Sequence, residues 1–144
     1  MLYFIINENN IFKNELAQYI KQFETDYECI VSQSVLKDTL KVAKIISKNP
    51  ETHRAVVVDE DGIGPFMVAA KVKNVICAQL NDEQSALMTR DHNNTNVISI
   101  GSGIVGIDVM KGIIKRFLTH DYAGGRHQVR IDMLNSMIEE NNNV

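Results

Sequence analysis

The sequence predicts an α/β protein of the three-layer α/β/α, Rossmann-like class, with a five-stranded parallel sheet as the middle layer. Five short apolar runs alternate with longer amphipathic stretches over the 144 residues, which is the order of successive βα units. The apolar runs are nearly continuous, as in residues 55–58, and such strands are covered by helices on both faces. We find no linker or internal repeat, so we expect residues 1–144 to form a single domain.

The expected strands are the apolar runs at residues 2–6, 28–32, 54–58, 74–78 and 96–100. The stretches between and after them predict helices over about residues 12–23, 34–48, 82–90, 107–118 and 126–138, and a further helix that begins near residues 62–65. Boundary residues support these limits: Ser34 is a suitable N-cap, Asn49-Pro50 is a stop signal, and Pro65 fits a first helical turn.

The composition argues against several classes of function. The net charge is −3, and the basic residues are scattered rather than clustered, so nucleic-acid binding is not expected. No apolar run reaches the roughly 20 residues of a membrane span, and residues 1–6 lack the basic region of a signal peptide, which favours a cytoplasmic protein. Cys29 and Cys77 lie in apolar runs without a CxxC pairing, so we expect two reduced core residues.

Ligands of open parallel sheets bind beyond the carboxyl ends of the strands, so the loop at residues 59–64 is a candidate phosphate loop. Gly62 and Gly64 precede a helix, and the amides of a helix N-terminus attract anions. However, Asp59, Glu60 and Asp61 place three negative charges in the same loop. The alternative is an ordinary turn at the start of a helix.

A second candidate site is the polar segment at residues 90–96, just before the last expected strand. Within this segment, His92 is a candidate acid–base group because imidazole titrates near neutral pH, and Asn93 is suited to hold a sugar hydroxyl. An exposed or hydrogen-bonded structural role for His92 is the alternative. Arg126 and Arg130 share one face at the start of the last helix, where they are suited to bind an anion or to form surface ion pairs.

Three motifs carry a resemblance to a known family: RDHNNTNV at residues 90–97, GSGIVG at 101–106 and GGRHQVR at 124–130. Together they resemble the ribose-5-phosphate isomerase B and galactose-6-phosphate isomerase family. The resemblance implies an α/β/α fold, a C-terminal helix used in oligomerisation, and active sites shared between subunits. It also implies aldose–ketose isomerisation of a sugar phosphate through a cis-enediol, with no metal or cofactor.

The resemblance assigns ring opening to His92, sugar contact to Asn93, and phosphate binding to Arg126 and Arg130. The other half of the site departs from the pattern. Members that are active alone have a cysteine base where this chain has Asp59, an Asp-His pair where it has Glu8-Asn9, and an arginine in place of Gly103.

The resemblance is greatest to the A-type subunits of galactose-6-phosphate isomerase, and it therefore implies a B-type partner that supplies the base. The isolated chain could also pair with itself. Two alternatives remain at this stage. One is a self-sufficient isomerase of the ribose 5-phosphate type, which would use Asp59 as its base. The other is a non-catalytic sugar-phosphate-binding or scaffold homologue.

Overall fold

The computed structural model describes residues 1–23 and 26–141, with the side chains of the last helix described as far as Ile138. A five-stranded sheet runs through the centre of the molecule in the order β2-β1-β3-β5-β4, and every neighbouring pair is parallel. Its strands are β1 (Leu2–Asn7), β2 (Tyr27–Ser32), β3 (Arg54–Asp59), β4 (Cys77–Gln79) and β5 (Val97–Gly101). The expected parallel sheet is thus confirmed.

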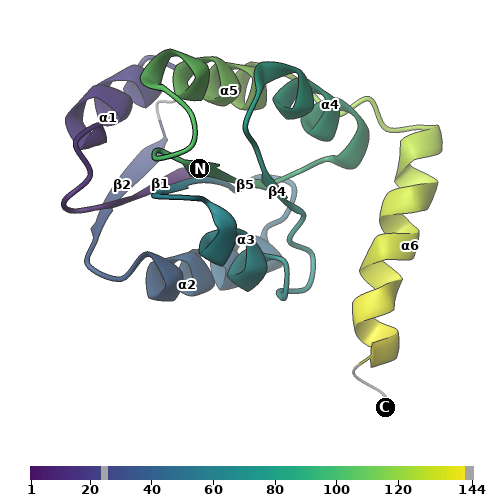
Figure 1. Cartoon of the computed structure of the whole chain (residues 1–144). Helices are drawn as coiled ribbons and strands as arrows, with labels where there is room; N and C mark the ends of the chain where they lie inside the picture. Colours follow the sequence, from purple (N-terminus) through teal and green to yellow (C-terminus); the bar gives the residue numbers. More distant parts are fainter. Residues whose placement is uncertain (24–25, 142–144) are drawn as a thin grey trace.

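Helices cover both faces of the sheet, as Figure 1 shows. They are α1 (Lys13–Lys21), α2 (Val35–Lys48), α3 (Ile63–Ala69), α4 (Glu83–Asn93), α5 (Ile107–Thr119) and α6 (Arg126–Asn141). One face carries α1, α5 and α4, the other carries α2 and α3, and α6 extends from one end of the molecule. This arrangement confirms the three-layer α/β/α class. No described helix is long and apolar enough to cross a membrane.

Strand alternation divides the buried side chains between two cores. Phe4 and Ile6 of β1 pack with Phe117 of α5 in the first core, and all three are fully buried. Ile5 of the same strand points the other way and packs with Ile46 of α2 in the second core. Each face of the sheet therefore has its own hydrophobic core.

Two expected boundaries were wrong, and each has a physical cause. The fourth strand begins at Cys77 instead of residue 74, because Asn74 has a φ of 63° and Asn96 bonds to the segment through its side chain. The fourth helix continues to Asn93, and the left-handed Asn94 ends it. His92 is therefore in the last turn of a helix rather than in a loop.

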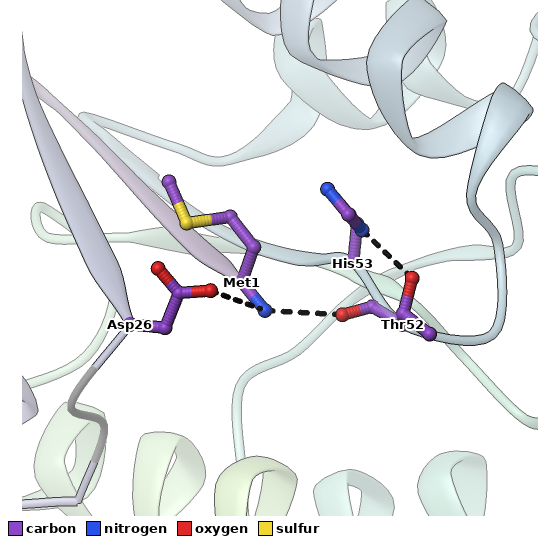
Figure 2. A network of polar contacts seen from close by, with 4 residues as sticks. All are labelled: Met1, Asp26, Thr52 and His53. Carbon is purple, nitrogen blue, oxygen red and sulfur yellow. Dashed lines mark hydrogen bonds and ion pairs between the residues drawn. The ribbon is translucent and has the colours of Figure 1, made fainter.

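The amino-terminal edge of the sheet is closed by a small polar network, shown in Figure 2. The Met1 amine donates to the Thr52 carbonyl oxygen at 3.1 Å and lies 3.5 Å from the Asp26 carboxylate. The His53 ring is 2.9 Å from the Thr52 hydroxyl and stacks on Tyr3. The larger cavity described below lies at the opposite, carboxyl-terminal edge of the strands.

The two cysteines lie on the two outer strands of the sheet. Cys29 is in β2 and Cys77 is in β4, and both are half-buried free thiols. Burial raises the pKa of Cys77 to about 12, so this thiol is protonated and unreactive at neutral pH. Both thiols are unpaired, as expected, but the expected core placement holds only in part, because neither side chain is fully buried.

Candidate functional site

The first cavity lies beyond the carboxyl ends of β1 and β3 and has a volume of about 650 Å³. The strand order changes direction between these two strands, which is where open parallel sheets bind ligands. Its polar wall includes Asn7, Asn10, Asp59, Glu60 and Ser102. No basic side chain is among the described residues that line it, so its charge is unfavourable for a phosphate group.

Carboxylates of the loop after β3 accept hydrogen bonds from the first amides of α3. The Gly62 amide donates to the Asp59 carboxylate, and the Ile63 amide donates to the Asp61 carboxylate at 2.9 Å. These are the first amides of α3, the groups that would otherwise attract a bound anion. Two side-chain carboxylates therefore occupy the positions that a substrate anion would need.

Gly62 and Gly64 each have a close neighbour where a side chain would begin. Gly62 has a φ of +74°, and a Cβ there would lie 3.0 Å from backbone atoms of Gly101 and Ile100. A Cβ at Gly64 would meet the Leu36 side chain at 3.0 Å. Neither glycine is among the described residues that line the cavity, and their role in substrate binding stays a prediction.

The turn after β5 is bonded to the acidic loop. The Ser102 amide donates to the Asp59 carbonyl oxygen and the Gly103 amide to that of Glu60, each at 2.8 Å. Asn10 donates from its side chain to the Ser102 hydroxyl at 2.9 Å. The amides of both loops at this edge are thus used inside the protein.

Asp59 lies in an environment that disfavours its charge. Burial raises the pKa of this carboxyl most, and the nearby charges of Asp61 and Glu60 raise it further. Hydrogen bonds from the Gly62 and Asp61 amides act in the opposite direction. The carboxylate that could serve as a base is also the acceptor that holds the loop together.

The second cavity lies between α4 and α6 and has a volume of about 460 Å³. It brings together His92 and Asn93 from the end of α4 with His127 and Arg130 from the start of α6. Arg126 belongs to the same helical turn but is exposed and is not among the described lining residues. Three of the four residues assigned by the resemblance therefore share one cavity.

Arg90 fixes the end of α4 beside this cavity. Its guanidinium donates to the Asn94 side chain at 2.9 Å, to the Thr95 carbonyl oxygen at 2.8 Å and to the His120 carbonyl oxygen at 3.2 Å. Burial is the main cause that lowers the pKa of Arg90, which nevertheless stays charged at neutral pH. By joining the end of α4 to the segment after α5, Arg90 sets the position of His92. From the sequence alone, Arg90 stands out only as part of the motif at residues 90–97.

A glycine pair and a backbone bond place α6 against α4. Gly124 and Gly125 have φ values of 67° and 59°, in the left-handed region that glycine favours. The Ala123 amide donates to the Asp91 carbonyl oxygen at 3.0 Å, and Ile131 of α6 is buried. These constraints bring the GGRHQVR motif at residues 124–130 close to the RDHNNTNV motif at residues 90–97, which contains His92.

The two cavities have no lining residue in common. His92 belongs to the cavity between the helices, while Asp59 belongs to the cavity at the strand ends. Each cavity therefore contains only some of the side chains that a proton-transfer reaction on an anionic sugar requires. Among the described residues, no three His, Cys, Asp or Glu side chains are grouped so that they could hold a metal ion.

The same three-layer fold is found in solved ribose-5-phosphate isomerases of type B. The structure from Mycoplasma genitalium with bound ribulose-5-phosphate superposes with a TM-score of 0.87 at 25% identity, covering 96% of this chain and 97% of that one. The Clostridium thermocellum structure gives a TM-score of 0.86 at 23% identity, covering 97% and 99% of the two chains. The fold thus places the chain in the class of sugar-phosphate isomerase-like α/β/α proteins.

The sequence relationship is more specific. The model of the Ribose/Galactose Isomerase family matches residues 8–134, and the chain belongs to this family. It is 45% identical over 130 residues to "Galactose-6-phosphate isomerase subunit LacA 1" of Streptococcus pyogenes, covering 86% of this chain and 92% of that protein. It is 47% identical over 128 residues to "Galactose-6-phosphate isomerase subunit LacA" of Enterococcus faecalis, covering 87% and 89%. These relatives are isomerase subunits.

Proposed function

We propose that this chain is the A-type subunit of a cytoplasmic galactose-6-phosphate isomerase, which interconverts D-galactose 6-phosphate and D-tagatose 6-phosphate together with a B-type subunit. The single observation that carries the proposal is the division of the site. His92, Asn93 and Arg130 share one cavity. At the other cavity, beyond the strand ends, the loop amides donate to carboxylates of the same loop and are not free to bind a substrate. The relationship to subunits of that name supports the choice of substrate.

The residues of the helix cavity suit the first step of the reaction. His92 gives a proton to the ring oxygen while the C1 hydroxyl loses one, and the ring opens to the aldehyde. Asn93 holds a sugar hydroxyl, and Arg126 and Arg130 pair with the phosphate. All of these groups act on the substrate without a cofactor.

The B-type subunit supplies the base for the second step. The base removes the proton from C2, and the electron pair forms the C1–C2 double bond of a cis-enediol as the C1 carbonyl oxygen takes up a proton. When the proton returns to C1, the O2 hydroxyl loses its proton and becomes the ketone. The carboxylates of Asp59 and Asp61 would repel the negative charge that develops in this step, so this chain is poorly suited to supply both halves.

The α6 helix presents an apolar surface that supports a subunit contact. Val129, Met133, Leu134 and Met137 are each about half exposed, and the last three also line the helix cavity. Exposed apolar side chains grouped on one element typically mark an interface. The partner that completes the site is its expected occupant, and self-association of the isolated chain would use the same surface.

Reconstitution tests the proposal. The purified chain, the B-type subunit and their mixture are each assayed for conversion of galactose 6-phosphate and of ribose 5-phosphate. We expect turnover of galactose 6-phosphate only in the mixture. Equal activity of the isolated chain would contradict the proposal and favour the self-sufficient isomerase. No activity of the mixture on either sugar would favour the non-catalytic homologue.

Substitutions in the reconstituted complex separate the two cavities. His92→Ala should lower kcat by about a hundredfold or more, the usual effect of removing an acid–base group. Asp59→Asn should leave kcat within about twofold, because the base belongs to the partner. The opposite pattern, loss with Asp59→Asn and retention with His92→Ala, would assign the base to this chain.

A further inference from the structure

The imidazole of His127 lies face to face with that of His92. The ring centroids are 4.4 Å apart and the planes differ by 14°. We propose that His127 is a positioning residue, whose stacked ring fixes the plane of the His92 imidazole for proton transfer to the sugar. Its catalytic consequence rests on the proposed function, whereas the ring contact itself does not.

Among the described residues, the His92 ring has no polar side-chain contact other than that with Asp91. Its side chain is 33% exposed in the last turn of α4. On one side, His92 Nε2 is 3.4 Å from an Asp91 carboxylate oxygen, and Asp91 is itself 41% exposed. A flat neighbour restricts rotation of the ring, and a small change in the aim of an acid–base group lowers the rate strongly.

The contact joins two elements that are far apart in the chain. His127 is in the first turn of α6, next to Arg126 and one turn before Arg130. The left-handed Gly124-Gly125 turn and the bond from Ala123 to Asp91 set the direction of that turn. His127 therefore links the arginines of α6 to the end of α4. When α6 docks on α4, the side chains of both helices that line the cavity are brought into position together.

The surrounding charges favour a neutral His127. The groups that face it are Asp91 and His92 from α4, and Arg126 and Arg130 from α6. Burial is the largest cause that lowers the pKa of His127, followed by His92 and the two arginines, and Asp91 opposes them. A neutral ring can stay stacked while His92 gains and loses a proton, because a cation is attracted to a neutral aromatic face.

Two substitutions separate stacking from the other properties of an imidazole. In the reconstituted complex, His127→Ala removes the flat ring, whereas His127→Phe keeps a flat ring that cannot titrate or donate. We expect His127→Ala to lower kcat about tenfold with KM changed less than about threefold, and His127→Phe to restore kcat to within about threefold of the wild type. His53→Ala is the matched control, because His53 also stacks on an aromatic ring, that of Tyr3, but is not among the described residues that line the helix cavity.

Other outcomes overturn the inference. If His127→Phe is as impaired as His127→Ala, the polar nitrogens act directly and the ring is not merely a support. A tenfold rise in KM with unchanged kcat in both variants would make His127 a phosphate ligand. Unchanged kinetics in both variants would leave no role for the stack.

NMR of the isolated chain distinguishes failure of the inference from failure of the proposed function. The His92 ring protons should be shifted upfield by the neighbouring ring, and the shift should be lost in His127→Ala and kept in His127→Phe. If the shift is absent in the wild type, the inference is wrong even when the complex is active. If the wild-type complex has no activity and the shift is present, the proposed function fails while the ring contact stands.

Discussion

The carboxylates of Asp59 and Asp61 lie at the start of α3, in the position where an anionic ligand would otherwise bind. Each accepts a hydrogen bond from an amide at the start of α3. A helix N-terminus favours a negative charge, and here the protein supplies that charge from its own loop. The same two side chains therefore complete the local structure and weaken the cavity as a phosphate site.

The raised pKa of Asp59 leads to a pH-dependent prediction. Because burial raises this pKa above its ordinary value of 3.8, the folded chain binds the proton more tightly than the unfolded chain does. Ionisation of Asp59 therefore lowers the free energy of unfolding as pH rises from the ordinary pKa through the folded pKa. In urea unfolding, Asp59→Asn should gain stability relative to the wild type between pH 4 and pH 7. A difference that does not change with pH would contradict this.

Gly62 is required by its backbone conformation and by its neighbours. Gly62→Ala should lower the free energy of unfolding by about 2 kcal/mol, because a left-handed alanine is strained and its Cβ would press on the backbone of β5. Gly106→Ala is the control, since Gly106 has a φ of −74° and a Cβ there meets nothing within 4 Å. Equal losses in urea unfolding of the two variants would contradict the assignment.

The hydrophobic pattern of the sequence predicted those strands and helices whose bounds depend on local sequence. Continuous apolar runs located four of the five strands to within about one residue. In β1, β3 and β5, burial on both faces leaves little choice of residue type. The fourth strand escaped because its first half, around Asn74, bonds to the Asn96 side chain instead of joining the sheet. The end of α4 escaped because polarity at residues 90–93 indicates a loop as readily as an exposed helical turn.

The apolar surface of α6 gives a prediction about assembly. Met133 is 59% exposed on that surface, so Met133→Glu should leave the fold intact and weaken association with the B-type subunit at least tenfold. Leu40→Glu is the control, because Leu40 is 38% exposed on α2, a helix that lies apart from α6 in Figure 1. Both are compared by analytical ultracentrifugation of the mixed subunits. Equal effects of the two substitutions would argue against α6 as the contact.

The sequence motifs identified the candidate residues, but they did not indicate how the whole fold divides these residues between two cavities. His92 and Asp59 could be named from motifs, yet only the fold places them in cavities with no residue in common. The stack of His127 on His92 also depends on how α6 docks on α4. The two histidines are 35 positions apart in the chain, so no local sequence pattern indicates their contact. In physical terms, helix and strand patterns are short-range, whereas these contacts are set by the packing of separate elements.

The structure also predicts that the folded core and the helix cavity can be separated. Neither hydrophobic core includes a residue of α6, and Ile131 is its one buried residue among those described. A chain ending at Ala123 should therefore keep its fold and lose no more than about 2 kcal/mol of stability, the burial value of one isoleucine. It should nevertheless fail to support turnover with the B-type subunit, because Arg126, His127 and Arg130 leave with the helix. Circular dichroism and urea unfolding test the first part and the reconstituted assay the second. A truncated chain that is unfolded would show that α6 belongs to the core, and one that remains active would remove α6 from the active site.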